Sequence, residues 1–130
     1  MVPRETVGHV YVDAICHGAR GKRKTLHLMV DAGATWSWMP AEFLHGLGIR
    51  PLRTDTFELA HGRTIRRPVG ELSVEILGRR ATTVVVFGRP RDAVLLGVYA
   101  LEGLALEMDS HSEALRAKEY VLAIRVPTPV

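Results

Sequence analysis

The feature that most constrains this chain is the stretch over residues 28–38, where an apolar segment leads directly into an acid and a glycine turn. Residues 28–30 are Leu-Met-Val, Asp31 follows at once, and Ala-Gly-Ala comes next. A carboxylate at the end of a buried strand is costly unless hydrogen bonds or a partner charge compensate it. Gly33 and its small neighbours allow backbone N–H groups to approach that carboxylate and donate to it. The stretch therefore predicts a buried strand that delivers one acid into a turn folded around it.

The length and composition of the chain are those of one globular domain. Its 130 residues suffice for one core and not for two, and 47% of them are hydrophobic. The formal net charge of +3 favours no more than loose attraction to acidic surfaces. Cys16 is the one cysteine, so no disulfide forms within the chain, and a cytoplasmic location is expected. We expect a single domain over residues 1–130, with its core over about residues 8–126, and no membrane partner.

Most of the chain is rich in residues typical of strands. The segments that we expect to be strands are 8–16, 25–30, 35–39, 52–60, 64–69, 71–77, 81–87, 93–96, 106–109 and 120–124. Short helices are expected over residues 40–45 and 98–104, and the polar segment before residue 120 leaves a helix open. Turn residues separate the middle strands at 61–63, at Pro68 and Gly70, and at 78–80. This spacing predicts an all-β sandwich or barrel rather than alternating strand–helix units.

The turn at Asp31 resembles the Asp-Thr/Ser-Gly active-site turn of the aspartic peptidases, and Leu95-Leu96-Gly97 resembles the hydrophobic-hydrophobic-Gly element of that family. The sequence holds a single Asp turn of this kind, so the resemblance is to the single-lobe, retropepsin-like branch, in which two identical chains each supply one Asp. It implies an all-β, single-lobe acid-protease barrel with one or two short helices, assembling as a symmetric homodimer. It also implies an aspartic endopeptidase that hydrolyses peptide bonds with a water activated between two copies of Asp31, without metal or cofactor.

The resemblance assigns the site residues position by position. Asp31 corresponds to the catalytic acid. The active-site turn around it comprises Ala32, Gly33, Ala34 and Thr35. The supporting loop comprises Leu95, Leu96 and Gly97. The flap that covers substrate corresponds to Ala60, His61, Gly62 and Arg63, with Trp36 as a further substrate-binding candidate. A peptide or protein substrate would lie extended across the dimer and pair with the flap through backbone hydrogen bonds.

One position departs from the family pattern. The second residue of the turn is usually Thr or Ser, whose hydroxyl links the two turns across the dimer, and here it is Ala32. Symmetry removes that hydrogen bond twice, at about 0.5–1.5 kcal/mol each. The departure leaves open a second function, a catalytically weak or inactive homodimeric peptide-binding module on the same fold.

Other chemistries find less support in the sequence. The six histidines and Cys16 show no pair at zinc-ligand spacing, so no metal site is expected. The serines lack a Gly-x-Ser-x-Gly setting, which argues against a serine nucleophile. The basic residues 20–24, with Arg63, Arg66 and Arg67, could attract nucleic acid. No aromatic stacking platform accompanies them, so solvated turns are favoured and nucleic acid is not an expected partner.

For two further features, the sequence leaves open whether the residues have a packing role or a functional role. Trp36 and Trp38 share one strand face, and large aromatic residues beside a turn are more often core or dimer-interface residues than cleft residues. Residues 120–124 fit a terminal strand that covers a sheet edge. In retropepsin-like proteins such strands from the two chains interleave, and this end of the chain is consistent with that role.

Overall fold

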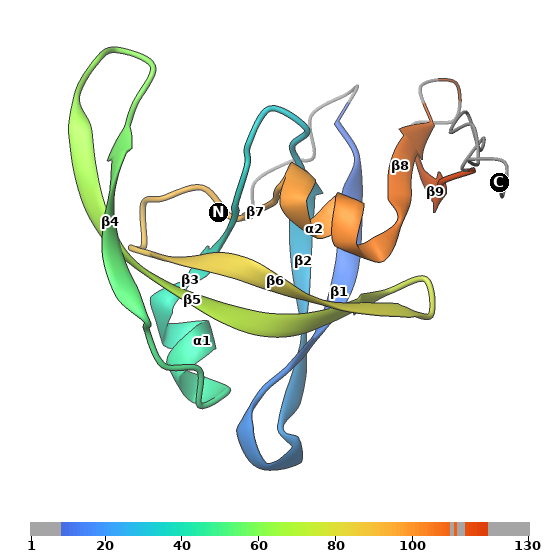
Figure 1. Cartoon of the computed structure of the whole chain (residues 1–130), viewed down its shortest axis with the longest axis horizontal. Helices are drawn as coiled ribbons and strands as arrows, with labels where there is room; N and C mark the ends of the chain where they lie inside the picture. Colours follow the sequence, from blue (N-terminus) through green and yellow to red (C-terminus); the bar gives the residue numbers. More distant parts are fainter. Residues whose placement is uncertain (1–8, 110, 112–113, 120–130) are drawn as a thin grey trace, which may run out of the picture.

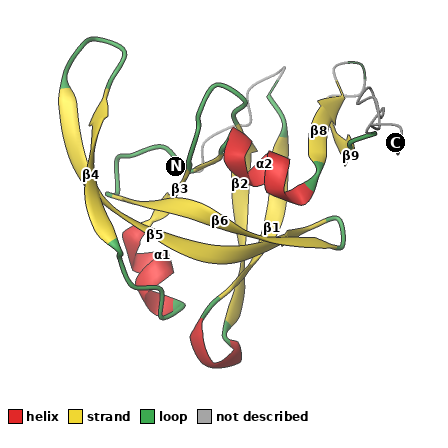
Figure 2. Cartoon of the chain, viewed as in Figure 1, coloured by secondary structure: helices red, strands yellow, loops and turns green. Residues whose placement is uncertain are grey.

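The computed structural model describes residues 9–109, 111 and 114–119, and strands make up most of it (Figures 1 and 2). The strands are β1 (Tyr11–His17), β2 (Arg23–Val30), β3 (Ser37–Pro40), β4 (Arg53–Glu58), β5 (Thr64–Ile76), β6 (Arg79–Gly88), β7 (Leu95–Leu96), β8 (Leu106–Asp109) and β9 (Ala114–Ala117). The helical elements are α1 (Ala41–Gly46), α2 (Val98–Leu104) and the 3₁₀ turn η1 (Ala19–Gly21). The expected mostly-β class with short helices is confirmed.

Seven of these strands form one sheet that closes on itself. Their order is β1-β2-β7-β3-β6-β5-β4, and a further antiparallel pairing joins β1 to β5. This pairing aligns residues 15–17 with residues 73–75. Six strands therefore form a closed ring, while β4 lies outside it and pairs with β5 among the described strands. The β4–β5 hairpin stands apart from the ring at the upper left of Figure 1.

The two-residue strand β7 determines where the chain after β2 must run. β7 lies between β2 and β3, parallel to β2 and antiparallel to β3. Leu95 pairs with Met29 on one side and with Trp38 on the other. The connection from β2 to β3 therefore crosses the end of β7. We call this connection, residues 31–36, the arch, and it carries the acid that the sequence analysis singled out.

Apolar side chains from the barrel and from both helices share one core. The buried members are Val10, Ala14, Cys16, Leu28, Val30, Met39, Leu44, Leu47, Leu72, Val74, Ile76, Val85, Phe87, Leu96, Ala100, Leu101, Leu104 and Leu106. Complete burial of one large side chain of this kind is worth about 1.5–3 kcal/mol. Nothing among the described helices has both the length and the apolar character needed to cross a membrane.

The two strands expected on either side of Gly70 are one continuous strand, β5, which passes through Pro68 and Gly70 without a turn. Pro68 lies just outside the ladder with β6, which begins at Val69, so its missing N–H removes no hydrogen bond from that ladder. A Cβ at Gly70 would lie 3.1 Å from Cε1 of Phe87. Glycine at this position therefore allows close packing against an aromatic ring, and the expected turn is wrong.

The polar segment before residue 120, where the sequence leaves a helix open, contains strand β9 instead. β9 pairs with β8 in antiparallel register, and Arg116 lies opposite Glu107. The Arg116 Nε and Glu107 Oε1 atoms are 3.0 Å apart, a cross-strand charge pair that supports the ladder. The strand expected over residues 120–124 lies outside the described residues.

Candidate active site

Asp31 lies where β2 ends and the arch begins. Its backbone N–H donates to the Leu96 carbonyl oxygen at 2.9 Å, and its own carbonyl oxygen accepts the Ala34 N–H at 3.2 Å. Its carboxylate oxygen Oδ1 accepts the Gly33 N–H at 2.9 Å. A Cβ at Gly33 would lie 3.2 Å from that oxygen, so glycine permits the close approach. The turn therefore holds the acid by backbone and side chain, and no described residue donates a hydrogen bond to Oδ2.

Gly97 joins β7 to α2 directly beneath the arch. A Cβ on this residue would lie 2.6 Å from the Trp36 carbonyl carbon and oxygen, a distance that real Cβ atoms do not adopt. The next two backbone N–H groups, at the start of α2, donate to the carbonyl oxygens of Ala34 at 2.7 Å and Thr35 at 3.1 Å. Because the first N–H groups of a helix have no partner inside the helix, α2 can use them to hold the arch. The predicted supporting segment therefore contacts the predicted turn.

Ser37 also supports the arch, a role that the sequence does not predict. The residue is completely buried, and its Oγ accepts the Gly97 N–H at 3.0 Å. A single hydroxyl among large apolar strand residues is the signal that indicates such a buried hydrogen bond. Ser37 therefore joins β3 to the start of α2 and stabilises the base of the arch.

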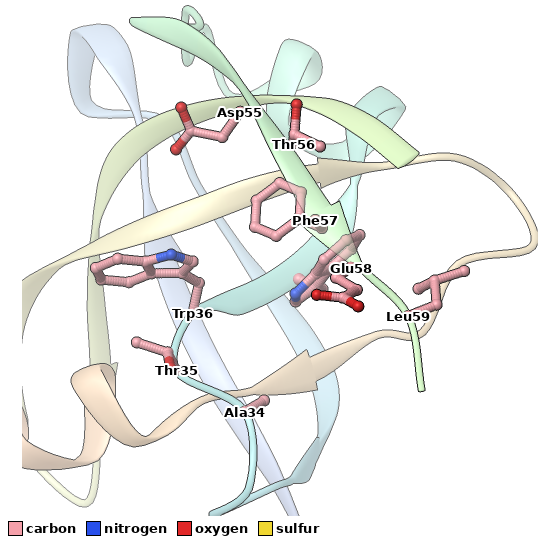
Figure 3. Close-up of a pocket in the computed structure, with 9 residues that line it drawn as sticks. Ala34, Thr35, Trp36, Asp55, Thr56, Phe57, Glu58 and Leu59 are labelled. Atoms are coloured by element: carbon pink, nitrogen blue, oxygen red, sulfur yellow. The ribbon is translucent and has the colours of Figure 1, made fainter. Parts of the chain in front are cut away.

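A groove of ≈ 580 Å³ lies between the arch and the β4–β5 hairpin (Figure 3). Its lining residues are Ala34, Thr35, Trp36, Trp38, Asp55, Thr56, Phe57, Glu58 and Leu59. The rings of Trp38 and Phe57 meet edge to face at a centroid distance of 5.0 Å, and Trp36 contacts Tyr99 at 5.3 Å. Neither tryptophan is a core residue, because both are half-buried and line this groove. The core position that the sequence favoured is therefore wrong, and the dimer-interface position stays a prediction.

The hairpin tip that the sequence analysis assigned to a flap is a tight, exposed turn. The Leu59 N–H donates to the Arg63 carbonyl oxygen at 2.7 Å, and the Gly62 N–H donates to the Leu59 carbonyl oxygen at 2.8 Å. Gly62 has φ +85°, which favours glycine. The tip residues Ala60, His61 and Gly62 do not line the groove, and neither does Asp31. The structure thus places strand β4, rather than the tip, across the groove from the arch.

An ion pair anchors β5 to the loop before β7. Arg67 Nε lies 2.6 Å from Asp92 Oδ2, and Arg67 Nη2 lies 3.0 Å from Asp92 Oδ1. The Arg67 guanidinium, mainly through this hydrogen bond, holds the pKa of Asp92 below its ordinary value, although desolvation acts in the opposite direction. The expectation of a solvated Arg67 is wrong, because the residue is 7% exposed. Nothing in the local sequence indicates a partner 25 residues away.

The remaining ionisable groups offer little alternative chemistry. Within the described part of the chain, no three His, Cys, Asp or Glu side chains gather in a way that could hold a metal ion. Cys16 is buried in β1, and burial raises the pKa of its thiol to about 12. A thiol of this kind stays protonated at neutral pH and is a poor nucleophile. Asp31 carries the one ionisable side chain among the residues of the arch.

The comparisons with known proteins converge on one family and one fold. Residues 19–103 match the family model described as "gag-polyprotein putative aspartyl protease", a range that includes the arch, the hairpin and β7. The solution structure of simian foamy virus (mac) protease is similar at 26% identity, covering 71% of this chain and 91% of that chain, with a TM-score of 0.52. A foamy viral protease–reverse transcriptase in complex with an RNA/DNA hybrid shares the fold at 20% identity and a TM-score of 0.53, over 73% of this chain and 12% of that chain. No curated protein matches the sequence.

Proposed function

The chain belongs to the retroviral-type, retropepsin-like family of aspartyl proteases, and from this membership we propose that it is an aspartic endopeptidase. The observation that carries the proposal is the geometry of Asp31. Its carboxylate accepts the Gly33 N–H at the end of a buried strand and keeps Oδ2 without a donor among the described residues. The groove that begins at Ala34 supports binding of an extended peptide beside this acid.

The reaction needs a second carboxylate, which we assign to Asp31 of a second copy of the chain. In a homodimer with two-fold symmetry the two arches meet, because an isologous interface pairs a surface with itself. Two carboxylates a few ångströms apart cannot both ionise cheaply, so the pair shares one proton. Each chain alone therefore holds half of the active site.

The shared proton defines the sequence of steps. The ionised carboxylate takes a proton from water, and the water oxygen attacks the scissile carbonyl carbon. The protonated carboxyl group donates its proton to the carbonyl oxygen, which gives a tetrahedral diol. When the C–N bond breaks, the first carboxyl group protonates the departing nitrogen, and the second carboxylate takes a proton back from the diol. The pair ends as it began, with one proton between two acids, and no metal or covalent intermediate takes part.

The other residues receive supporting roles in this proposal. The turn residues that surround the acid are Ala32, Gly33, Ala34 and Thr35. The residues that support the turn are Leu95, Leu96 and Gly97. The flap and substrate-binding residues are Ala60, His61, Gly62, Arg63 and Trp36. We assign all of them to one domain over residues 1–130, with a peptide or protein as the substrate.

Cleavage of a diverse peptide library tests the proposal. The wild-type protein should cleave at mildly acidic pH, and Asp31→Asn should not, because an amide cannot take the proton of the attacking water. Asp13→Asn is the matched control, since it removes an exposed carboxylate from β1 by the same substitution. Cleavage that survives in Asp31→Asn would remove Asp31 from the mechanism.

A second candidate function is a homodimeric peptide-binding module with weak or no catalysis. The observation that favours it is Ala32, an exposed residue without the hydroxyl that usually links the two turns. A binding module should hold peptides equally well with Asp31 or with Asn at position 31, and it should cleave none. An enzyme should lose turnover in Asp31→Asn while it still forms dimers.

A further inference from the structure

A second groove, of ≈ 630 Å³, lies between β5 and the loop that leads into β7. Its lining residues are Leu59, Arg63, Thr64, Ile65, Arg66, Arg67, Arg89, Arg91, Asp92 and Ala93. Five of the ten are arginines and one is an acid. The first groove, by contrast, is lined by the carboxylates of Asp55 and Glu58 and by no arginine. The two grooves beside the β4–β5 hairpin therefore differ in the sign of their charge.

The positive charge of the second groove is only partly neutralised. Arg67 and Asp92 form a bidentate ion pair, so they cancel each other. The four other arginines are Arg63, Arg66, Arg89 and Arg91, all exposed. None of the four guanidinium groups forms an ion pair with a residue that the structure describes, and Arg89 bonds Asp92 through its backbone N–H and carbonyl oxygen rather than through its guanidinium. Four like charges around one groove repel one another, and an anion placed among them relieves that repulsion.

The groove also lies close to the proposed catalytic acid. Ala93, on its wall, precedes Leu96 by three residues, and the Leu96 carbonyl oxygen accepts the Asp31 N–H at 2.9 Å. Three residues of extended chain span at most about 10 Å. A peptide bound beside Asp31 in extended form would thus reach the groove within about three of its own residues.

We propose that this groove binds an acidic side chain of the peptide substrate, about three residues from the scissile bond. The proposal rests on the proposed function, because it takes Asp31 as the point of cleavage. Guanidinium groups pair with carboxylates through charge-assisted, bidentate hydrogen bonds, which gives the groove a preference for Asp or Glu over their amides. A homodimer carries two such grooves, so the preference applies on both sides of the scissile bond. The lining contains no aromatic side chain on which a base could stack, and this favours a carboxylate over nucleic acid.

Binding to the Asp31→Asn protein tests the inference without any need for cleavage. Fluorescently labelled peptides carry one Glu at successive positions, each is paired with the same peptide carrying Gln, and anisotropy gives the two affinities. At one position on either side of the central bond the Glu peptide should bind about fivefold to tenfold more tightly than the Gln peptide at low salt. The advantage should shrink at high salt, because these arginines are exposed.

Two double variants identify the groove. Arg66→Gln with Arg91→Gln should abolish the Glu advantage, since it removes two of the four unpaired charges. Lys22→Gln with Arg23→Gln removes the same charge from the exposed β1–β2 hairpin and should preserve the advantage. Circular dichroism checks that both variants are folded.

Three outcomes would overturn the inference. The first is equal affinity for the Glu and Gln peptides, including no binding of either, and the second is a Glu advantage that both double variants lose equally. The third is an unstructured RNA oligonucleotide that binds more tightly than the Glu peptides and requires Arg66 and Arg91. Failure of the proposed function is distinguishable from these outcomes. If the wild-type protein cleaves nothing while its Asp31→Asn form keeps the Glu advantage, the proposed peptidase function is contradicted and binding of acidic peptides in the groove is supported.

Discussion

Replacing Gly97 with alanine should weaken the hold of α2 on the arch and destabilise the whole domain. The backbone of Gly97 has φ −91°, which alanine adopts freely, so the cost comes from contacts. The new Cβ would lie 2.6 Å from the Trp36 carbonyl carbon and oxygen and 2.8 Å from the Thr35 carbonyl oxygen. Ordinary contact begins near 3.4 Å, so two backbone segments must separate by about 0.8 Å.

The cost has two parts. Overpacking at an inflexible site costs about 1–3 kcal/mol. The separation also stretches the hydrogen bond from Gly97 N–H to Ser37 Oγ and those from the start of α2 to the carbonyl oxygens of Ala34 and Thr35, each worth about 0.5–1.5 kcal/mol. Alanine also lowers the conformational entropy of the unfolded chain, which offsets about 0.4–1 kcal/mol of this cost. We therefore expect Gly97→Ala to lower the free energy of unfolding by about 2–4 kcal/mol, a large share of the roughly 5–15 kcal/mol of a typical domain.

Urea unfolding of the variant and of a matched control measures this effect. Gly103→Ala makes the same substitution within α2, where the new Cβ would meet the Ala81 Cβ at an ordinary 3.4 Å. It should be neutral or stabilising by up to about 1 kcal/mol, because glycine is unfavourable in a helix. Both variants are compared at one protein concentration, since dimerisation would shift the midpoint. If Gly97→Ala unfolds at the same urea concentration as Gly103→Ala, the close approach of α2 to the arch does not hold in solution.

Three further predictions concern an ion pair, a thiol and the turn. Because Arg67 holds the pKa of Asp92 below its ordinary 3.8, this carboxylate contributes stability in full above that pH and loses it as the pH falls through the lowered pKa of the folded state. Asp92→Asn should therefore lower the free energy of unfolding, measured in urea at neutral pH, by about 2 kcal/mol or more. The variant should also lose less stability than the wild type as the pH falls, and an equal loss would contradict a stabilising Arg67–Asp92 ion pair. The Cys16 thiol, whose pKa burial raises to about 12, should resist a thiol reagent at pH 8 in the native protein and react fully in urea. Prompt labelling without urea would show that β1 opens. Ala32→Thr should strengthen self-association about tenfold in analytical ultracentrifugation, through two new hydrogen bonds across the two-fold axis, and no change would place the turn outside the interface.

The parts of the site that sequence reasoning predicts correctly are local. The Asp31 turn and the turn at Gly62 depend on hydrogen bonds between residues two to four positions apart. Residue types such as glycine carry that information directly, because few other residues tolerate a positive φ or so close a backbone contact. The turn at Asp31 therefore follows from the local sequence, whereas the support by Gly97 is implied by the resemblance to the family.

The parts that sequence reasoning misses depend on distant partners. Gly97 and Ser37 are 60 residues apart, and Arg67 and Asp92 are 25 residues apart. Their contacts arise because β7 inserts between β2 and β3, an order of strands that hydrophobic alternation does not encode. Gly70 is a similar case, because the sequence alone does not distinguish a glycine that allows close packing against an aromatic ring from a glycine in a turn. Local patterns therefore identify Asp31 and its turn, whereas the residues that line the two grooves come together only in the tertiary structure.

The central claim, that each active site takes one Asp31 from each of two chains, is tested most directly by mixing. Asp31→Asn protein is added to a fixed amount of wild-type protein under conditions where subunits exchange, and peptide cleavage is followed as the variant increases. Mixed dimers hold a single acid, so activity per wild-type chain should fall to about half at equal amounts and continue to fall with further variant. Asp13→Asn keeps Asp31 and adds active sites of its own, so with this control activity per total chain should stay constant. Activity per wild-type chain that stays constant as Asp31→Asn increases would contradict a shared site and assign the chemistry to one chain.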